Sequence, residues 1–417
     1  MHSVVEDKDL LTEILLRLAV KDLLRYKCVC KEWLSLISES QFCNRHTLGL
    51  CRNHKLYASG MLLQETEDCL ILKKARITPF SNNSNNRFTY LHLHNEFDGL
   101  LYYRIRQSCN GLLLWDSAPI QWPSPPYDME AKKFLQGCRY FYISNPSTGH
   151  CVRIDQFGYE IHHPNFSNPV LVFEPWKSPH YKIIFFAKVV ELATNKMKMN
   201  VYSSDTGSWS KVDVLTFPND IRYFRNNGVY CNGAIHWYDV VDDRSKVYFD
   251  IDGLCFKNYF PALPIPPVPP FKNYFPALPI PPVPPYYKQL AELYLGNSGE
   301  NLYMIVQKND DSLKLIYGIW ELKKDYSEWI VRFHVDLTTF EAGTFDVDAF
   351  DVVRQPPNDE HEQEDSILAI LIINRTKLVA YNLKDHSSRI LYEEDRFYSP
   401  SFHHHYFETL TSILPSY

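Results

Sequence analysis

The sequence has no block of lysine and arginine. Its 43 basic and 49 acidic residues are spread along the chain and give a net charge of −6. Nucleic-acid binders and polybasic membrane-binding segments need clustered positive charge to neutralise phosphate groups. We therefore expect no nucleic acid and no membrane among the partners of this protein.

Long hydrophobic runs are also missing. No stretch reaches the length of about 20 apolar residues that a membrane-spanning helix requires. Residues 1–9 contain no basic region leading into an apolar one, so we expect no secretory signal. The ten cysteines are scattered and form no CxxC pair, which favours reduced and mostly buried thiols over disulfides or a metal site. The expected compartment is the cytosol or the nucleus.

Recognisable catalytic motifs are absent as well. The sequence contains no GxSxG, no Walker phosphate loop, no HExxH and no GxGxxG. Two of the three histidines at His403-His404-His405 would share one face of a strand, but no carboxylate or cysteine stands directly beside them to complete a metal site. We interpret them as ordinary surface or partly buried histidines. The sequence therefore predicts no enzyme activity, no cofactor and no metal.

A helical pattern is present in the first fifty residues. The apolar side chains of the first run recur at a period of 3.6 residues and predict one apolar helix face: Leu10, Leu11, Ile14, Leu15 and Leu18. A second run continues this spacing: Leu23, Leu24, Val29, Trp33, Leu36 and Ile37. Three short helices over about residues 8–38 fit both runs. So small a bundle rarely buries enough surface to be stable alone, so it must lean on another protein or on the rest of the chain.

The same residues carry a resemblance to a known family. Residues 9–18 (DLLTEILLRL) and 20–33 (VKDLLRYKCVCKEW), followed by Phe42, resemble an F-box. This resemblance implies binding to a Skp-type adaptor and, through the adaptor, to a cullin scaffold. It also implies an adaptor-binding set drawn from the apolar positions of the motif: Leu10, Leu11, Ile14, Leu15, Leu18, Val20, Leu24, Val29 and Trp33.

The segment departs from the family pattern at two positions. Glu6-Asp7 stand where Leu-Pro is usual, and Ala19 stands where proline is frequent. A proline would preset φ near −65° at these helix starts. We therefore expect the departures to affect adaptor affinity more than the fold.

Beyond residue 50 the period changes from helical to extended. Short β-branched and aromatic runs between polar turns predict strands at residues 111–115, 140–143, 181–186, 301–306 and 367–373. A loose unit of strand, polar turn and second strand also recurs, beginning at Tyr142, Val201, Val247, Ile319 and Leu378. Its intervals of roughly 45 to 75 residues bracket the kelch-like period of about 50. The sequence thus predicts an α+β chain, with a three-helix F-box followed by a large all-β domain, a kelch-like β-propeller; a β-sandwich is the alternative.

Three phrases in this region are similar to the F-box-associated domain that follows plant F-boxes, which is described as propeller-like. They are SCNGLL at residues 108–113, ISNPSTG at residues 143–149, and GVYCNGAIHW at residues 228–237. The resemblance covers most of residues 100–400. It implies an F-box at residues 1–50, a connecting region with the first strands at 51–100, and the propeller-like domain at 101–417.

A proline-rich insertion interrupts the β region at residues 256–285. Residues 256–270 (FKNYFPALPIPPVPP) are repeated identically at 271–285. So much proline excludes a helix or a central strand and favours an extended polyproline II loop. Its PxxP spacing would suit docking to an aromatic groove, but a duplicated surface loop is the favoured interpretation because identical copies indicate little structural constraint.

Together these patterns predict a non-catalytic substrate receptor of a ubiquitin ligase. The helices would bind the adaptor, and the β domain would bind a target protein whose identity the sequence does not reveal. Two alternatives are kept: an F-box-like scaffold that acts outside a ligase, and a propeller hydrolase whose site is assembled from distant loops.

Overall fold

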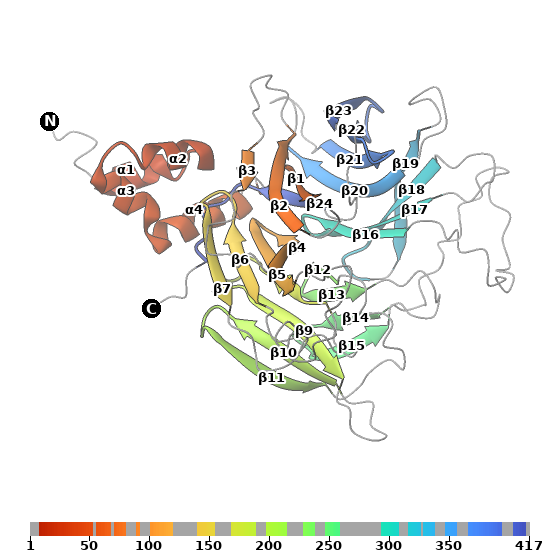
Figure 1. Cartoon of the computed structure of the whole chain (residues 1–417), viewed down its shortest axis with the longest axis horizontal. Helices are drawn as coiled ribbons and strands as arrows, with labels where there is room; N and C mark the ends of the chain where they lie inside the picture. Colours follow the sequence, from red (N-terminus) through yellow and green to blue (C-terminus); the bar gives the residue numbers. More distant parts are fainter. Residues whose placement is uncertain are drawn as a thin grey trace, which may run out of the picture.

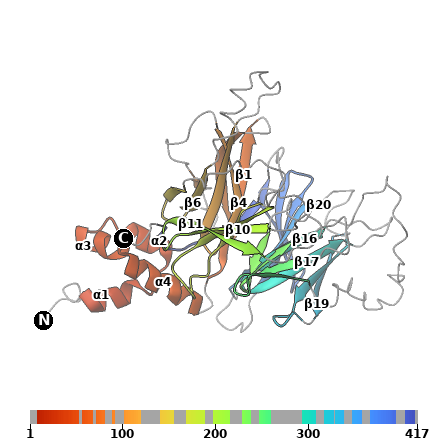
Figure 2. The ribbon, with the colours of Figure 1, turned by 90° about the horizontal axis from the view of Figure 1, so that it is seen from below.

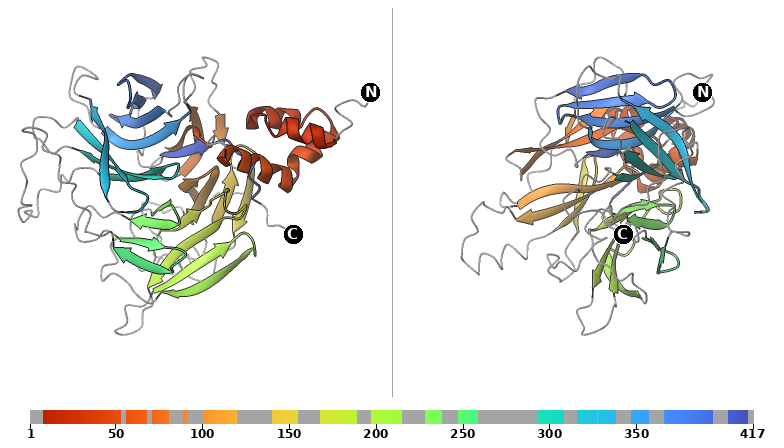
Figure 3. Two further views of the ribbon diagram at one scale, coloured as in Figure 1. Left: turned by 180° about the vertical axis from the view of Figure 1, so that it is seen from behind. Right: turned by 90° about the vertical axis from the view of Figure 1, so that its right-hand side faces the viewer.

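The computed structural model describes residues 8–52, 56–67, 71–80, 89–91, 101–119, 140–154, 168–188, 197–214, 228–237, 247–258, 293–307, 316–326, 328–337, 347–356, 366–393 and 403–413. A small group of helices lies to one side of a ring of sheets (Figure 1). The same arrangement is seen from below and from behind (Figures 2 and 3). No helix in these ranges has the length and apolar character needed to cross a bilayer.

Four helices open the chain. They are α1 (Lys8–Leu15), α2 (Val20–Tyr26), α3 (Lys31–Ser38) and α4 (Ser40–Arg52). The first three confirm the helices predicted over residues 8–38, and α4 was not predicted. Ala19 precedes α2 with φ −66°, which is close to the value that a proline ring imposes. The backbone at this helix start therefore has the φ that a proline would impose, although alanine stands there.

The β region forms six antiparallel sheets of four strands each. In order around the ring, blade 1 contains β24 (His403–Phe407), β1 (Ala58–Glu67), β2 (Ile71–Pro79) and β3 (Thr89–Leu91). Blade 2 contains β4 (Leu101–Cys109), β5 (Leu112–Pro119), β6 (Phe141–Asn145) and β7 (His150–Ile154). Blade 3 contains β8 (Val170–Val172), β9 (Lys182–Lys188), β10 (Met197–Ser203) and β11 (Ser208–Val214).

The second half of the ring repeats this plan. Blade 4 contains β12 (Val229–Cys231), β13 (Ala234–Trp237), β14 (Val247–Asp250) and β15 (Cys255–Asn258). Blade 5 contains β16 (Leu293–Ser298), β17 (Asn301–Gln307), β18 (Ile316–Leu322) and β19 (Trp329–Asp336). Blade 6 contains β20 (Val347–Gln355), β21 (Ser366–Ile373), β22 (Lys377–Asn382) and β23 (Ser388–Glu393).

The ring is closed by strands from its two ends. β24 pairs with β1 in antiparallel register, with Ala58 opposite Phe407 and Leu63 opposite His403. The innermost strands β24, β4, β8, β12, β16 and β20 contact one another in sequence around the centre. The chain is therefore a closed six-bladed β-propeller, which confirms the predicted propeller and overturns the β-sandwich alternative.

The five repeat units of the sequence are the outer hairpins of five blades. The units that begin at Tyr142, Val201, Val247, Ile319 and Leu378 lie in the hairpins β6–β7, β10–β11, β14–β15, β18–β19 and β22–β23. Each pairs its two strands antiparallel. Their spacing is thus the length of chain that each blade uses.

Apolar clusters hold adjacent blades together. Trp115 of blade 2 packs with Leu62 and Ile77 of blade 1, and Trp237 of blade 4 packs with Phe186 of blade 3. Further clusters join blades 4 and 5, blades 5 and 6, and blades 6 and 1. Burial between blades therefore continues around the whole ring.

Two sequence expectations need correction. The proline-rich insertion was expected to be loop from residue 256, but residues 256–258 form part of β15; residues 259–285 lie outside the described residues. Eight cysteines fall within the described ranges, all as free thiols, and only three of them are buried. The expectation of mostly buried thiols is therefore wrong for this part of the chain.

Candidate functional site

Helix α1 carries two apolar stripes that face in different directions. Leu11 and Leu15 are 8% and 1% exposed and pack in the core of the helical bundle. Leu10 and Ile14 lie one helical turn apart on the neighbouring stripe, and they are 45% and 43% exposed. The helical spacing predicted one apolar face for all four residues, whereas the structure separates a core stripe from a solvent-facing one.

A second set of exposed apolar side chains surrounds the corner between α2 and α3. Val29 is 59% exposed, Leu34 is 47% exposed, and Tyr26 is 38% exposed. The Tyr26 ring lies edge-on to Trp33, with 5.6 Å between the ring centroids. Tyr26 and Leu34 were not among the predicted adaptor-binding residues, because helical spacing alone does not reveal which apolar positions remain at the surface.

The nine predicted residues therefore fall into three environments. Leu10, Ile14 and Val29 are exposed. Leu18, Leu24 and Trp33 are partly buried against the bundle core. Leu11, Leu15 and Val20 are buried within that core. Solvent-exposed members of the set are the ones whose side chains a partner could cover directly.

The exposed charges of the helices form pairs between helices. Arg45 Nη2 of α4 lies 2.6 Å from Glu13 Oε1 of α1, and Lys8 Nζ lies 3.4 Å from Glu39 Oε1. Exposed pairs of this kind typically contribute at most about 1 kcal/mol. Because these charged pairs are common on protein surfaces, the exposed apolar side chains are the distinctive chemical feature of the helical surface.

The bundle core is completed from the far end of the chain. Leu410 is 1% exposed and packs among the buried residues of α1 to α4. Lys21 Nζ of α2 also lies 2.8 Å from Glu408 Oε1, and Thr47 Oγ1 of α4 lies 3.4 Å from Thr411 Oγ1. The helices thus pack against residues 408–411, while the apolar side chains of α1 and of the α2–α3 corner remain exposed.

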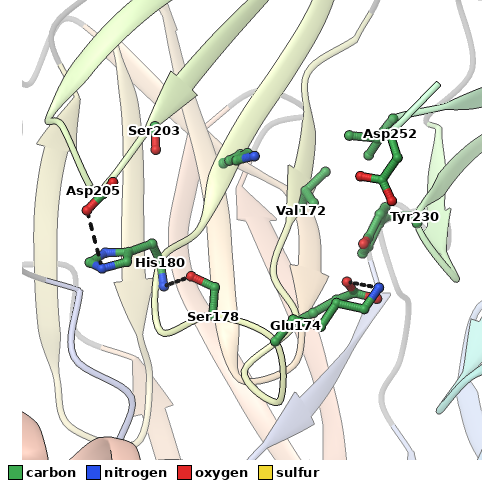
Figure 4. Close-up of a pocket in the computed structure, with 12 residues that line it drawn as sticks. Val172, Glu174, Ser178, His180, Ser203, Asp205, Tyr230 and Asp252 are labelled. Atoms are coloured by element: carbon green, nitrogen blue, oxygen red, sulfur yellow. Dashed lines mark hydrogen bonds and ion pairs between the residues drawn. The ribbon is translucent and has the colours of Figure 1, made fainter. Parts of the chain in front are cut away.

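A pocket of about 360 Å³ lies between blades 3 and 4. The connections β8–β9, β10–β11, β12–β13 and β14–β15 line it (Figure 4). Four of its polar side chains form two pairs: Glu174 lies 2.7 Å from Lys177, and His180 lies 3.5 Å from Asp205. Burial, together with the neighbouring Glu174, raises the pKa of Tyr230, which keeps its hydroxyl neutral. These four polar side chains of the pocket therefore already have partners.

One of the three consecutive histidines makes an ion pair that the local sequence does not suggest. His405 Nε2 of β24 lies 2.8 Å from Asp351 Oδ2 of β20, and their side chains are 11% and 5% exposed. Burial favours the neutral ring, but the Asp351 carboxylate outweighs it and raises the pKa of His405. The pair joins blade 6 to the closing strand of blade 1. Within the described ranges, no group of three or more potential metal ligands comes together.

Comparisons with known proteins agree with this division into helices and propeller. A family model described as "F-box protein At3g26010-like, beta-propeller" matches residues 89–412, and an F-box domain model matches residues 7–45. F-box protein At5g07610 of Arabidopsis thaliana is 28% identical over an alignment of 355 residues, and the match covers 81% of this chain and 72% of that protein. F-box/kelch-repeat protein At3g23880 of the same plant is 26% identical over an alignment of 269 residues, and the match covers 62% of this chain and 65% of that protein.

Solved structures resemble the chain more distantly. A crystal structure of a mutant of AofleA from Arthrobotrys oligospora aligns with a TM-score of 0.33 and 8% identity, over 70% of each chain. A likeness at this level carries no functional argument. The propeller family model, by contrast, covers well over half of the chain, and an F-box precedes it. The chain therefore belongs to the family of F-box proteins with an At3g26010-like β-propeller.

Proposed function

We propose that this protein is the substrate-recognition subunit of a Skp–cullin–F-box ubiquitin ligase. Its helices bind a Skp-type adaptor, and the adaptor connects it to a cullin scaffold. The observation that carries this proposal is the set of exposed apolar side chains on α1 and around the α2–α3 corner, foremost Ile14 and Val29. Clustered exposed apolar residues on a soluble domain typically mark a protein-binding surface.

The propeller is the part that binds the target protein. Such a receptor needs two binding surfaces and no reactive groups of its own, because it accelerates ubiquitin transfer by holding the target near the conjugating enzyme. Its turns and the pocket between blades 3 and 4 offer polar and apolar groups for that purpose. The cytosol or the nucleus is the proposed compartment.

A pair of matched substitutions tests the adaptor face. Ile14→Asp and Val29→Asp place a charge at side chains that are 43% and 59% exposed, so the chain should fold as before. Ile390→Asp is the control, because Ile390 is 48% exposed but lies on the outer strand of blade 6. Binding of each purified full-length protein to a Skp-type adaptor is measured by calorimetry.

The expected outcome is specific to the helices. Each helix variant should weaken adaptor binding by at least about tenfold, as loss of an interface anchor usually does, and the Ile390 variant should bind like the unchanged protein. Equal binding by all three variants would show that the adaptor uses another surface. Failure of the unchanged protein to bind any Skp-type adaptor would favour a scaffold that acts outside a ligase.

A further inference from the structure

The segment that follows the closing strand runs between the helices and the propeller. Residues 408–413, named here the strap, leave β24 after Phe407 and cross the turns of blade 2. Most of the strap is buried: Thr409 is fully buried near its start, and Ile413 at its end is 1% exposed. The strap is therefore part of the packed interior although it lies near the end of the chain.

A single amide group of blade 2 binds the strap backbone at two points. Asn145 Nδ2 donates hydrogen bonds to the carbonyl oxygens of Thr409 and Thr411, at 3.1 and 3.0 Å. Asn145 is fully buried, and its Oδ1 accepts a bond from the backbone N–H of Ser147. The Ser147 hydroxyl in turn accepts a bond from the backbone N–H of Thr409 at 3.2 Å. The ISNPSTG phrase thus contributes two of the side chains that hold the strap, Asn145 and Ser147.

A second sequence phrase makes room for the strap. Gly111, in the tight turn between β4 and β5, has φ +96°, and a Cβ there would lie 2.5 Å from Thr409 Oγ1. In the same phrase, Ser108 Oγ donates to the carbonyl oxygen of His405 at 2.6 Å. The SCNGLL phrase therefore supports the closing strand and leaves space for the residues that follow it.

The other side of the strap belongs to the helices. Leu410 is the only strap residue in the core cluster of the bundle, where it packs with Leu11, Leu23 and Phe42. Among the described elements, α2 packs on α3 and α3 packs on α4, but no helix packs extensively on a strand. In the described part of the chain, the strap thus provides a packed connection between the helices and the propeller.

The far end of the strap is anchored in the propeller core. Ile413 packs within the largest apolar cluster, and the Tyr181 hydroxyl donates to its carbonyl oxygen at 3.5 Å. The strap is thus held by the propeller on both sides of Leu410. Movement of the helices relative to the blades would require either Leu410 or its flanking bonds to give way.

We infer that the strap fixes the orientation of the helices relative to the propeller, with Asn145, Gly111 and Leu410 as positioning residues. Its importance for a ligase rests on the proposed function, because a fixed orientation sets where the target lies relative to the adaptor. The rigidity itself does not depend on that function. The inference concerns the geometry between two surfaces rather than the affinity of either one.

Distance measurements between two spin labels test this inference directly. The labels are attached through unnatural amino acids at Gln41 of α4 and Asp213 of β11, which are both exposed. Asn145→Ala loosens the strap on the propeller side without touching the bundle core, and Leu410→Ala loosens it on the helix side. Asn232→Ala is the matched control, because Asn232 Nδ2 donates to the carbonyl oxygen of Glu300 at 2.7 Å, away from the strap.

The unchanged protein and the Asn232 variant should each give one narrow distance peak, and both strap variants should lose it in favour of a broad distribution. Circular dichroism checks that the helices of the Leu410 variant remain folded; if they do not, the Asn145 variant alone decides the result. A broad distribution in the unchanged protein, or a narrow one in the Asn145 variant, would overturn the inference. Adaptor affinity, measured on the same samples, should be the same for the Asn145 variant and the unchanged protein. If the unchanged protein gave a narrow distance peak but did not bind the adaptor, the proposed function would be refuted. The inference that the strap fixes the orientation of the helices would still stand.

Discussion

Replacing Asn145 with alanine should destabilise the protein far more than loss of one side chain on a turn normally does. The amide nitrogen of this fully buried residue serves the carbonyl oxygens of Thr409 and Thr411. Alanine would leave both carbonyl groups buried without this donor. Each such loss costs about 1–3 kcal/mol, so the free energy of unfolding should fall by about 2–6 kcal/mol.

The control for this prediction is the same change at Asn232. Its amide also donates to a carbonyl oxygen, that of Glu300, but both residues are exposed and water can replace the lost bond. Asn232→Ala should therefore cost less than Asn145→Ala, even with the backbone strain that alanine meets at the φ of +50° of this position. Urea unfolding followed by tryptophan fluorescence measures both variants. Equal losses, or a loss below about 1 kcal/mol for Asn145→Ala, would refute the reasoning that the strap is held by buried bonds.

Three further changes follow from the structure. Ala19→Pro should raise the free energy of unfolding by about 0.4–1 kcal/mol, because φ at this position already suits proline; a lower melting temperature would contradict this. Gly111→Ala should destabilise the protein strongly because the new Cβ would collide with the strap. Gly149 has φ +74° and open space around it, so Gly149→Ala should cost only the backbone strain. Equal losses of the free energy of unfolding in urea would count against a close contact between Gly111 and the strap. The His405–Asp351 pair should stabilise the fold fully below the unfolded-state pKa of about 6.5 and lose its effect as pH rises through the raised folded-state pKa. The stability difference between the unchanged protein and His405→Gln should accordingly shrink at alkaline pH, and a difference that grows with pH would show the opposite sign of linkage.

The outer hairpins of the blades could be predicted because their signal is local. A polar turn between two β-branched or aromatic runs is contained in about a dozen residues, and the structure forms a hairpin at each such unit. The strands at residues 301–306 and 367–373 were predicted within one residue of β17 and β21 for the same reason. The local pattern therefore predicted individual hairpins of the propeller but not the number of blades.

Closure of the ring could not be predicted in the same way. β1 and β24 stand at opposite ends of the β region, and nothing near either strand indicates that they pair. His403-His404-His405 has the composition of a surface segment, yet β24 forms an inner strand. There His405 pairs with the Asp351 carboxylate, which lies on a strand about fifty residues earlier in the sequence. Pairing at such separation depends on the assembled fold.

The helical region shows a similar limit. Helix α4 was missed because its sequence alternates apolar residues with Asn44, His46 and Thr47, which blur the apolar period. In the structure His46 is buried and its Nε2 lies 2.8 Å from the carbonyl oxygen of Leu18, while burial lowers its pKa. Leu410, from the far end of the chain, fills the same core. The core of the helical bundle thus includes residues outside the F-box segment, which the local sequence pattern could not identify.

Hydrogen exchange of the full-length protein, alone and with a Skp-type adaptor, tests the proposed role most directly. We expect a one-to-one complex in which added protection of backbone amides is confined to α1, α2, α3 and the turns between them, with the propeller strands exchanging as before. Absence of a complex, or protection that falls on the blades while residues 8–38 exchange unchanged, would contradict the assignment of the exposed apolar helix surface to the adaptor.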